Sequence, residues 1–202
     1  MHVLRGAIAL ASLAVLPCNG DCPRYKGTGL VTHVTGTVPV TSSPVQTPAP
    51  TPGIHYTPTR HAVADAMLTL ANVGPGDVVF DLGSGDGRIV IIAAQKYGAR
   101  GVGIELDAKL IEQSRQNARD AGVEDRVTFT RADLFTADIS TATVVALYLS
   151  PSMNRELAPR LQKELKPGAR VVSHQFPLPG WTVTERTTHD GSEIFLYRLQ
   201  AP

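Results

Sequence analysis

Aromatic residues are scarce in this sequence, and neither sign of charge is in large excess. Phe, Trp and Tyr make up 5% of the 202 residues, and the formal net charge is +1 at pH 7. Proteins that bind single-stranded nucleic acid use aromatic stacking platforms in basic grooves, and duplex binders use many Lys and Arg contacts to phosphates. The composition provides neither, so we expect no nucleic acid among the partners.

Cysteine is nearly absent: the two in the chain, Cys18 and Cys22, both lie close to its start. A structural zinc site needs four ligands, commonly two spaced pairs, and no second pair is present, so we expect no metal. The tripeptide Leu16-Pro17-Cys18 resembles a lipoprotein cleavage box, except that Pro17 replaces the small residue expected there. Lipidation of Cys18, a Cys18–Cys22 disulfide and inert thiols all stay open.

The apolar run at the start is too short to span a bilayer comfortably. Arg5 precedes the run Gly6 to Leu16, and a positive start followed by a short apolar stretch is typical of a targeting segment. We interpret residues 1–22 as a signal-peptide-like or lipoprotein-like segment that could contact a membrane. The expected localisation is membrane-associated or exported, with a cytoplasmic location as the alternative.

Residues 23–54 are rich in Thr and Pro and poor in large apolar residues. Five prolines crowd the second half, at positions 39, 44, 48, 50 and 52. Such a composition buries too little apolar surface to fold and favours extended polyproline geometry. We predict a disordered linker, acting as a spacer or, alternatively, as a proline-rich ligand, ahead of a single folded domain at 55–202.

The folded domain is organised around a short strand followed by a glycine turn. Val78 to Phe80 form an apolar, β-rich run, and Gly83, Gly85 and Gly87 then free the backbone to turn and to approach a ligand closely. The apolar run Ile89 to Ala94 reads as a helix packed back on the strand. Strand, glycine turn and helix form the nucleotide-binding half of a doubly wound sheet.

The charges around the turn indicate which ligand it takes. A dinucleotide fingerprint has the spacing G-x-G-x-x-G, whereas here Arg88 stands where a glycine would be needed. Asp81 and Asp86 flank the turn, and their charge would repel a pyrophosphate and attract a cation. S-adenosylmethionine carries a sulfonium, an ammonium and a ribose, so it fits this charge pattern.

These residues resemble the sequence motifs of the class I S-adenosylmethionine-dependent methyltransferases. Asp81-x-Gly83-x-Gly85-x-Gly87 is similar to motif I, Gly103 to Asp107 to the second strand with a ribose-binding acid, and Arg131 to Phe135 to the third-strand end with an acid on the adenine amine. The resemblance implies S-adenosylmethionine as co-substrate. It also implies the following cofactor-binding residues: Asp81, Gly83, Ser84, Gly85, Gly87, Glu105, Leu106, Asp133 and Leu134.

The remaining pattern alternates strands and helices. Thr59 is the expected cap of a first helix reaching about Val73, and Asp107 caps a third helix. Pro159 should break a fourth helix or start a second short helix at its first turn, and Asp190-Gly191 should turn a terminal hairpin. Strands are expected at 78–80, 101–105, 126–131, 143–149, 169–175, 181–188 and 192–199. We predict an α/β fold: a Rossmann-like doubly wound seven-stranded sheet, parallel except for an antiparallel terminal hairpin.

Methyl transfer is an in-line displacement, so positioning matters more than a dedicated base. The stretch Leu147 to Pro151 lacks the Asn/Asp-Pro-Pro-Tyr signature of nucleobase amine methyltransferases and lacks a carboxylate cluster for a metal. Tyr148 and His174 remain as catalytic candidates: Tyr148 lines the methyl channel or packs, and His174 faces substrate or, as we favour, is a core histidine. Arg88 either pairs with Asp86 or reaches the cofactor carboxylate.

A closer resemblance covers residues 55–199. Asp81 to Arg88, Asp133-Leu134-Phe135 with Asp138, and Ala169 to Trp181 are similar to a small protein-lysine methyltransferase family that modifies the mitochondrial adenine nucleotide translocase and the ATP synthase c-subunit. Tyr56-x-Pro58 is the segment that would fold over the cofactor. The resemblance implies methylation of a protein lysine, with a membrane protein as a conceivable substrate. Alternatives are a small-molecule N-methyltransferase and a non-catalytic S-adenosylmethionine-binding lipoprotein.

Overall fold

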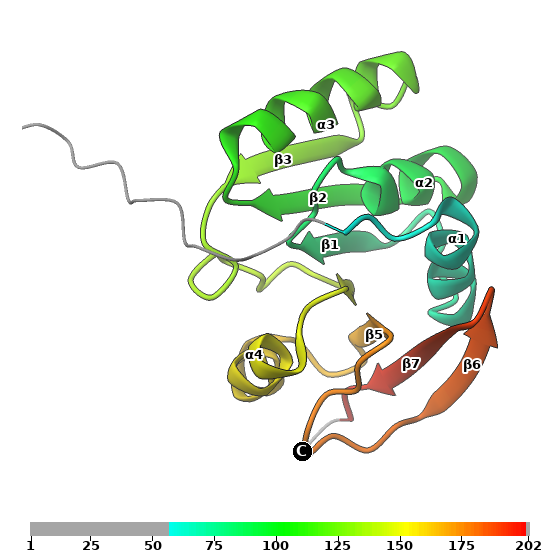
Figure 1. Cartoon of the computed structure of the whole chain (residues 1–202), viewed down its shortest axis with the longest axis vertical. Coiled ribbons are helices and arrows are strands. Elements are labelled where there is room, and N and C mark those ends of the chain that lie inside the picture. Colours follow the sequence, from blue (N-terminus) through cyan, green and yellow to red (C-terminus); the bar gives the residue numbers. More distant parts are fainter. Residues whose placement is uncertain (1–56, 201–202) are drawn as a thin grey trace, which may run out of the picture. The chain divides into compact units, whose positions relative to one another are not determined.

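The structure is a computed structural model that describes residues 57–200 (Figure 1). The segments expected at 1–22 and 23–54, the two cysteines, and Tyr56 lie outside the described residues. The helices are α1 (His61–Leu70), α2 (Arg88–Tyr97), α3 (Ala108–Asp120) and α4 (Pro151–Glu164). The strands are β1 (Val78–Leu82), β2 (Arg100–Glu105), β3 (Val127–Arg131), β4 (Val144–Leu147), β5 (Arg170–His174), β6 (Glu185–His189) and β7 (Ser192–Arg198).

All seven strands belong to one sheet with the order β3-β2-β1-β4-β5-β7-β6. The first five pair in parallel, while β7 pairs antiparallel with both β5 and β6. Asp190 and Gly191 close the hairpin with φ values of 50° and 73°, the left-handed pair that a two-residue hairpin turn requires. The predicted fold class is confirmed, including the insertion of β7 as an antiparallel strand.

Apolar side chains divide into two clusters, one on each face of the sheet. On one face, helices α1, α2 and α3 bury residues such as Met67, Val90 and Ile111 against the strands. On the other, α4 buries Leu157 and Leu161 against the strands. The strand order reverses between β1 and β4, and in such sheets a ligand binds at the carboxyl ends of the strands beside that reversal.

The start of α1 differs from the prediction. Arg60 occupies the N-cap position without a side-chain bond to the helix, so Thr59 is not the cap. The Thr59 side chain is instead buried, and its hydroxyl bonds to Nδ1 of His174, 115 residues away. The helix also ends at Leu70, because Asn72 turns to a φ of 50° ahead of the Gly74-Pro75-Gly76 segment. A long-range contact has replaced the local cap.

The predicted break at Pro159 is also wrong, because α4 runs through it as one helix. Proline removes the hydrogen bond to the carbonyl of residue 155. Pro159 and Arg155 are both exposed, so water can reach that carbonyl. Leu157 and Leu161 are fully buried on the sheet side, and their burial offsets the cost of the missing bond.

Candidate active site

The glycine turn links the end of β1 to the start of α2. Gly83, Gly85 and Gly87 have φ values of 84°, 55° and 80°, which residues with a Cβ rarely adopt. The N–H groups of Gly83 and Ser84 both donate to the carbonyl of Ile104 on β2, at 2.8 and 2.9 Å. A Cβ on Gly87 would lie 2.5 Å from the ring of Phe129, so this position needs glycine for space as well. The turn is therefore tightly held against β2 and β3.

Asp81, on β1 just before the turn, is a buried carboxyl group with a strongly shifted pKa. Its side chain is 3% exposed. Burial, followed by the negative charges of Glu105 and Asp86, raises the pKa of Asp81 to about 8. A buried carboxyl group with this environment is stabilised by a nearby cation. The acidic residues that the sequence places around the turn, Asp81 and Asp86, are therefore close enough in the structure to affect each other's charge.

Glu105 ends β2 and holds the glycine turn directly. Its Oε2 accepts a hydrogen bond from the N–H of Gly85 at 3.0 Å. Its Oε1 accepts from the N–H groups of Leu106 and Asp107 at 2.7 and 3.0 Å. A carboxylate accepts about four hydrogen bonds, so about one direction is left for a ligand hydroxyl. Glu105 thus both orders the loop and can receive a ribose.

The expected adenine-side residues follow β2 and β3. Leu106 is 46% exposed, an unusual state for a leucine in a compact domain. Asp133 is exposed, and its Oδ1 accepts from the N–H of Phe135 at 2.9 Å. Leu134 lies beside the turn, with its Cδ2 3.9 Å from where a Cβ on Gly83 would be. Leu134 therefore joins the glycine turn directly, while Leu106 and Asp133 stand at the neighbouring strand ends.

Two buried polar groups lie in or beside the glycine turn. The Ser84 hydroxyl is buried and has no hydrogen-bond partner among residues 57–200. The Asp81 carboxyl lies on β1 just before the turn, where burial and the negative charges of Glu105 and Asp86 raise its pKa. Buried polar groups are normally satisfied, so an exception calls for an explanation such as a bound water, an ion or a functional role. The Ser84 oxygen lies 2.7 Å from where a Cβ on Gly103 would be, so it faces β2, and it is the Asp81 carboxyl that fits the positive charge of S-adenosylmethionine.

Arg88 pairs with Asp86 beside the glycine turn. Its guanidinium binds both oxygens of Asp86, at 2.9 and 2.6 Å, and donates to the backbone oxygen of Thr59 at 2.7 Å. Of the two roles considered from the sequence, the pairing with Asp86 is the one present. The consequence is structural: Arg88 ties the segment before α1 to the glycine turn.

Tyr148 and His174 lie together at the ends of β4 and β5. Their rings stack with centroids 4.0 Å apart and an interplanar angle of 30°. His174 is buried, and burial followed by the charge of Arg60 lowers its pKa to about 4, so the ring is neutral at pH 7. Sequence reasoning did not connect Thr59 to this pair, because no local pattern marks a contact over 115 residues.

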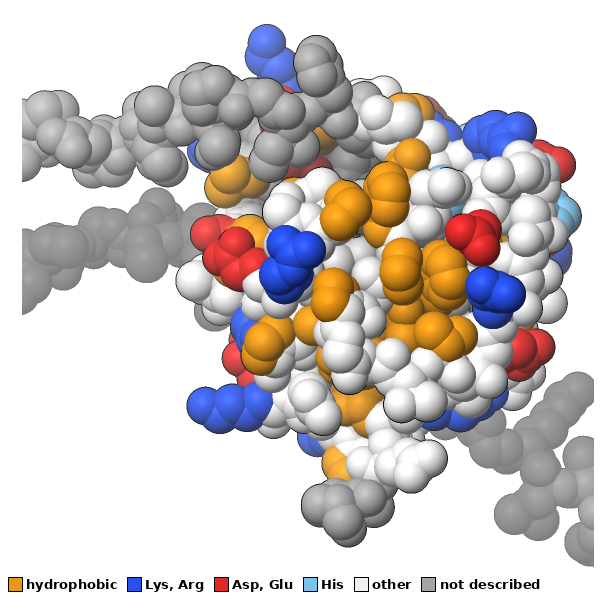
Figure 2. Space-filling view, turned by 60° about the horizontal axis from the view of Figure 1, so that its bottom comes forward, with side chains coloured by type: hydrophobic (Ala, Val, Ile, Leu, Met, Phe, Trp, Pro, Cys, Tyr) orange, Lys and Arg blue, Asp and Glu red, His pale blue; other side chains and the backbone are white. Residues whose placement is uncertain are grey.

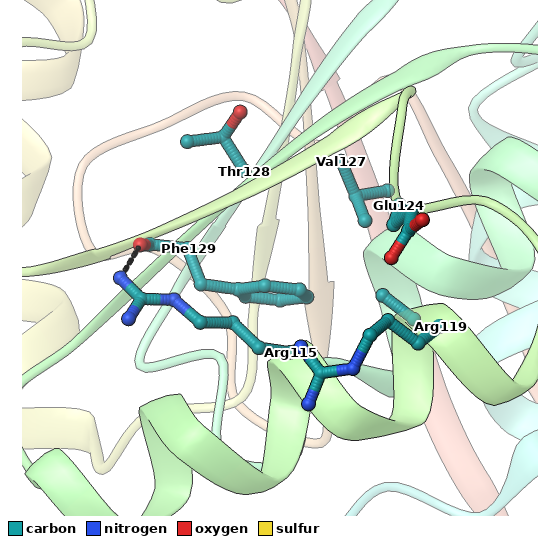
Figure 3. Close-up of a pocket in the computed structure, with 7 residues that line it drawn as sticks. Arg115, Arg119, Glu124, Val127, Thr128 and Phe129 are labelled. Carbon is teal, nitrogen blue, oxygen red and sulfur yellow. Dashed lines mark hydrogen bonds between the residues drawn. The ribbon is translucent and has the colours of Figure 1, made fainter.

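Two surface cavities of residues 57–200 lie away from the glycine turn. One, of about 200 Å³, opens between α3 and β3 and is drawn in Figure 3. Its Arg115 already donates to the carbonyl of Phe129 at 3.1 Å. A second, of about 410 Å³, lies between α1 and β6. Neither of these two cavities is lined by a residue of the glycine turn.

Neither a metal cluster nor a membrane-spanning helix is found in residues 57–200. No group of three or more His, Cys, Asp or Glu side chains in that part of the chain could hold a metal ion. Within the same range, no helix combines the length and apolar character needed to cross a bilayer.

Comparisons with known proteins point to methyltransferases. Residues 81–185 match the model of the ANTKMT methyltransferase domain. A protein-lysine N-methyltransferase of Saccharolobus islandicus is 43% identical over 135 residues, which cover 66% of this chain and 84% of that protein. The ATP synthase c-subunit lysine N-methyltransferase of Mus musculus is 34% identical over 196 residues, covering 93% of this chain and 78% of that protein.

A solved structure is similar over most of the domain. The crystal structure of an RNA methyltransferase from Salinibacter ruber in complex with S-adenosylhomocysteine has a TM-score of 0.71 and 50% sequence identity. The similarity covers 72% of this chain and 95% of that one.

Proposed function

The chain belongs to the family of the ANTKMT methyltransferase domain, and on that premise we propose that it transfers a methyl group from S-adenosylmethionine to the side-chain amine of a protein lysine. It is an S-adenosylmethionine-dependent methyltransferase with the seven-stranded Rossmann-like fold. The proposal therefore concerns the acceptor and the residues that bind the co-substrate.

One observation carries the co-substrate assignment. The buried Asp81 carboxyl has a pKa raised to about 8, and Glu105, one strand away, reaches the N–H of Gly85 at 3.0 Å. A cation beside Asp81 would relieve the unfavourable potential, and a sugar hydroxyl would fill the remaining acceptor direction of Glu105. A pyrophosphate at the same place would add negative charge beside Asp81 and Glu105 and would disfavour the ionised form of Asp81 further.

The binding residues follow from this arrangement. Asp81 with the turn from Gly83 to Gly87 would hold the positively charged end, and Glu105 would hold the ribose. Leu106, Asp133 and Leu134 would border the adenine, where the exposed Leu106 gives an apolar surface for the base. When bound, S-adenosylmethionine supplies a methyl group activated by its positively charged sulfur. The chain contributes positioning and charge complementarity, which suffice for an in-line displacement.

A lysine acceptor must lose its ammonium proton before it can attack. Leu106 and Asp133 at the same strand ends are exposed, so water reaches this edge and can take the proton without a dedicated base. No cationic side chain is required next to the acceptor, and the neutral His174 at this edge adds no charge that would oppose an incoming ammonium. Access of water to this edge and the neutral state of His174 are both compatible with a lysine side chain of a protein substrate as the acceptor.

The named activities of the relatives support a protein acceptor, and two further features extend the proposal to membranes. The mouse relative is named for the ATP synthase c-subunit. The side of the domain that carries α4, β6 and β7 in Figure 1 shows hydrophobic side chains gathered on its surface (Figure 2). In the segment before β6, Val183 is 40% exposed and Trp181 is half-buried. We propose a membrane protein as acceptor, with residues 1–22 as a membrane-proximal or export segment and a cytoplasmic location as the alternative.

The Salinibacter ruber structure gives RNA as a second candidate acceptor, because that protein is described as an RNA methyltransferase. The formal net charge of +1 and the aromatic content of 5% argue against it for this chain. The two classes of acceptor are separable in one assay.

Purified protein and tritiated S-adenosylmethionine are incubated with protein and with RNA from cells lacking the gene. Mass spectrometry of lysine methylation, with and without the gene, then identifies the modified residue. The proposal expects label on lysine, lost in a Glu105→Ala variant. Label on RNA alone would show that RNA and not protein is the acceptor. If neither is labelled although S-adenosylmethionine binds, a further incubation with small amines separates a small-molecule enzyme, which labels one of them, from a non-catalytic binding protein, which labels none.

A further inference from the structure

The sheet register aligns three residues at the carboxyl edge. Leu82 is the register partner of Leu147, and Leu147 is the register partner of Ser173. The residues that follow these three are Gly83, Tyr148 and His174. Neighbouring strands lie about 5 Å apart, so Tyr148 stands one strand from the glycine turn and His174 one strand further. The co-substrate residues occupy β1 to β3, which leaves the β4 and β5 side for the acceptor.

The segment after β4 contacts the glycine turn and carries Tyr148. Cδ2 of Leu149 lies 3.2 Å from where a Cβ on Gly83 would be, so the chain beyond Tyr148 packs against the turn itself. Tyr148 is half-buried, with its ring on that of His174 at 4.0 Å. His174 is held in turn by the buried hydroxyl of Thr59 at 3.2 Å. Thr59, His174 and Tyr148 thus form a chain of contacts that fixes the Tyr148 ring at the carboxyl edge of the sheet.

The backbone beside His174 is in a strained turn. Gln175 has a φ of 67°, and the N–H of Phe176 donates to the carbonyl of His174 at 2.8 Å. This pattern, with a positive φ at a central residue other than glycine, is the rare form of the γ-turn. Such strain costs about 1–3 kcal/mol and is found where the surroundings enforce it, most often at functional sites.

Three groups enforce this turn. The carbonyl of Phe176 accepts hydrogen bonds from the Ser173 hydroxyl at 2.6 Å and from Nδ2 of Asn154 at 3.1 Å. The N–H of Gln175 donates to the carbonyl of Glu193 at 2.7 Å. Asn154 is fully buried, so α4 commits a polar side chain to holding this turn. These hydrogen bonds therefore hold the backbone after β5 in one conformation. Burying apolar side chains alone would not require a strained turn at this position.

Resting on the proposed function, we infer that Tyr148 contacts the acceptor amine and aligns it with the methyl group, and that His174, held by Thr59 and the Gln175 turn, is a positioning residue that fixes the Tyr148 ring. The phenol can accept a hydrogen bond from the amine, which keeps the nitrogen lone pair free to form the new C–N bond. The electrons of the breaking C–S bond pass to sulfur, and the proton of the ammonium leaves to water.

Four variants test this role in the full-length protein. Tyr148→Phe keeps the ring and removes the hydroxyl, and Tyr148→Ala removes the ring. His174→Ala removes the stack, and His174→Phe restores a ring. Tyr97→Phe is the matched control, since Tyr97 ends α2 at the other edge of the sheet and bonds to Asp65 and Thr69. The assay is transfer of tritiated methyl to lysine in protein from cells lacking the gene, with S-adenosylhomocysteine affinity measured by calorimetry.

The inference expects Tyr148→Phe to lower kcat/KM for the acceptor about three- to tenfold, the worth of one hydrogen bond. Tyr148→Ala and His174→Ala should lower kcat about 100-fold through misplacement of the amine, and His174→Phe should recover most of the loss. S-adenosylhomocysteine affinity should stay within about twofold in every variant, since no removed group binds the nucleoside. If Tyr148 and His174 only stabilise the fold, the same variants should instead lower thermal stability and leave kcat per folded molecule unchanged.

Failures of the two proposals are distinguishable. If the wild type labels no protein lysine, the proposed function fails. If the wild type labels lysine and both Tyr148 variants match it, Tyr148 does not contact the amine and the inference is wrong. If the Tyr148 variants are impaired but His174→Phe is as poor as His174→Ala, ring stacking is not what positions Tyr148. Tyr148→Phe, which is nearly isosteric, decides the first question even where an alanine variant fails to fold.

Discussion

Binding of S-adenosylmethionine should release a proton from Asp81. In the free protein, burial and the charges of Glu105 and Asp86 raise the pKa of Asp81 to about 8. At pH 7, about nine-tenths of these carboxyl groups therefore hold a proton. A sulfonium bound at the glycine turn would favour the ionised form, and the proton would leave to the buffer.

The size of the effect follows from Coulomb's law. A unit charge about 6 Å away in a medium of effective dielectric constant about 20 contributes about 2.8 kcal/mol, which is about two pK units. The pKa of Asp81 in the complex would then be about 6, and roughly 0.8 proton would be released at pH 7. The apparent affinity for S-adenosylmethionine should accordingly rise several-fold between pH 6 and pH 7.

Calorimetry in buffers of different ionisation enthalpy measures this number directly, because the slope of observed heat against buffer enthalpy is the proton count. S-adenosylhomocysteine is the matched ligand: it has the same ammonium and ribose but no sulfonium, so it should release less. Asp81→Asn should abolish the release. Equal proton counts for the two ligands, or an unchanged count in the variant, would refute the assignment of Asp81 as the group that senses the sulfonium.

The free protein offers an independent check. Because the folded pKa of Asp81 is raised, the folded state holds a proton that the unfolded chain has lost, and stability falls as pH rises toward 8. His174 has the opposite shift, with a folded pKa lowered from 6.5 to about 4, so the proton lost by the unfolded chain adds a smaller rise in stability, about 0.4 kcal/mol between pH 6.5 and 8. From pH 6.5 to 8 the free energy of unfolding should drop by about 1.5 kcal/mol through Asp81, and Asp81→Asn should flatten this slope.

Three substitutions test the supporting structure by urea unfolding. Gly87→Ala should destabilise the domain by at least about 1–3 kcal/mol, since φ is +80° and the new Cβ would lie 2.5 Å from Phe129; an unchanged midpoint would contradict this steric account. Pro159→Ala should stabilise it by about 1–3 kcal/mol by restoring a helical hydrogen bond on an exposed surface, and a loss of stability would mean that the proline is required. Asp77→Ala should lower the free energy of unfolding by about 3–5 kcal/mol, because the largely buried Arg170 would lose its ion-pair partner. A loss below about 1 kcal/mol, the value typical of exposed ion pairs, would contradict this.

The parts of the fold that the sequence predicts well depend on local signals. The strand at Val78, the glycine turn and the helix from Arg88 follow from side-chain size and backbone freedom over a dozen residues, and they lie where expected. Asp107 caps α3 as predicted, with its Oδ1 accepting from the N–H of Lys109 at 2.7 Å. Asp190-Gly191 turns the hairpin for the same local reason.

The parts that sequence reasoning missed depend on contacts between distant segments. Thr59 has the composition of a helix cap, but His174 lies within hydrogen-bond distance only once β5 is in place. Pro159 signals a helix break, but the buried leucines beside it decide otherwise. Nothing in the sequence predicts the positive φ of Gln175, because glutamine rarely adopts that conformation. These contacts come from packing, which no local pattern encodes.

The central claim is that a sulfonium nucleoside binds over the glycine turn with its ribose on Glu105. Calorimetric titration of wild type and Glu105→Ala with S-adenosylmethionine tests it most directly, with thermal unfolding of both free proteins as the control for the three backbone hydrogen bonds that Glu105 accepts. We predict saturable binding by the wild type and a loss of about 1.5–3 kcal/mol, tenfold or more in Kd, in the variant. No heat of binding with the wild type, or equal affinity in a folded Glu105→Ala variant, would contradict the account.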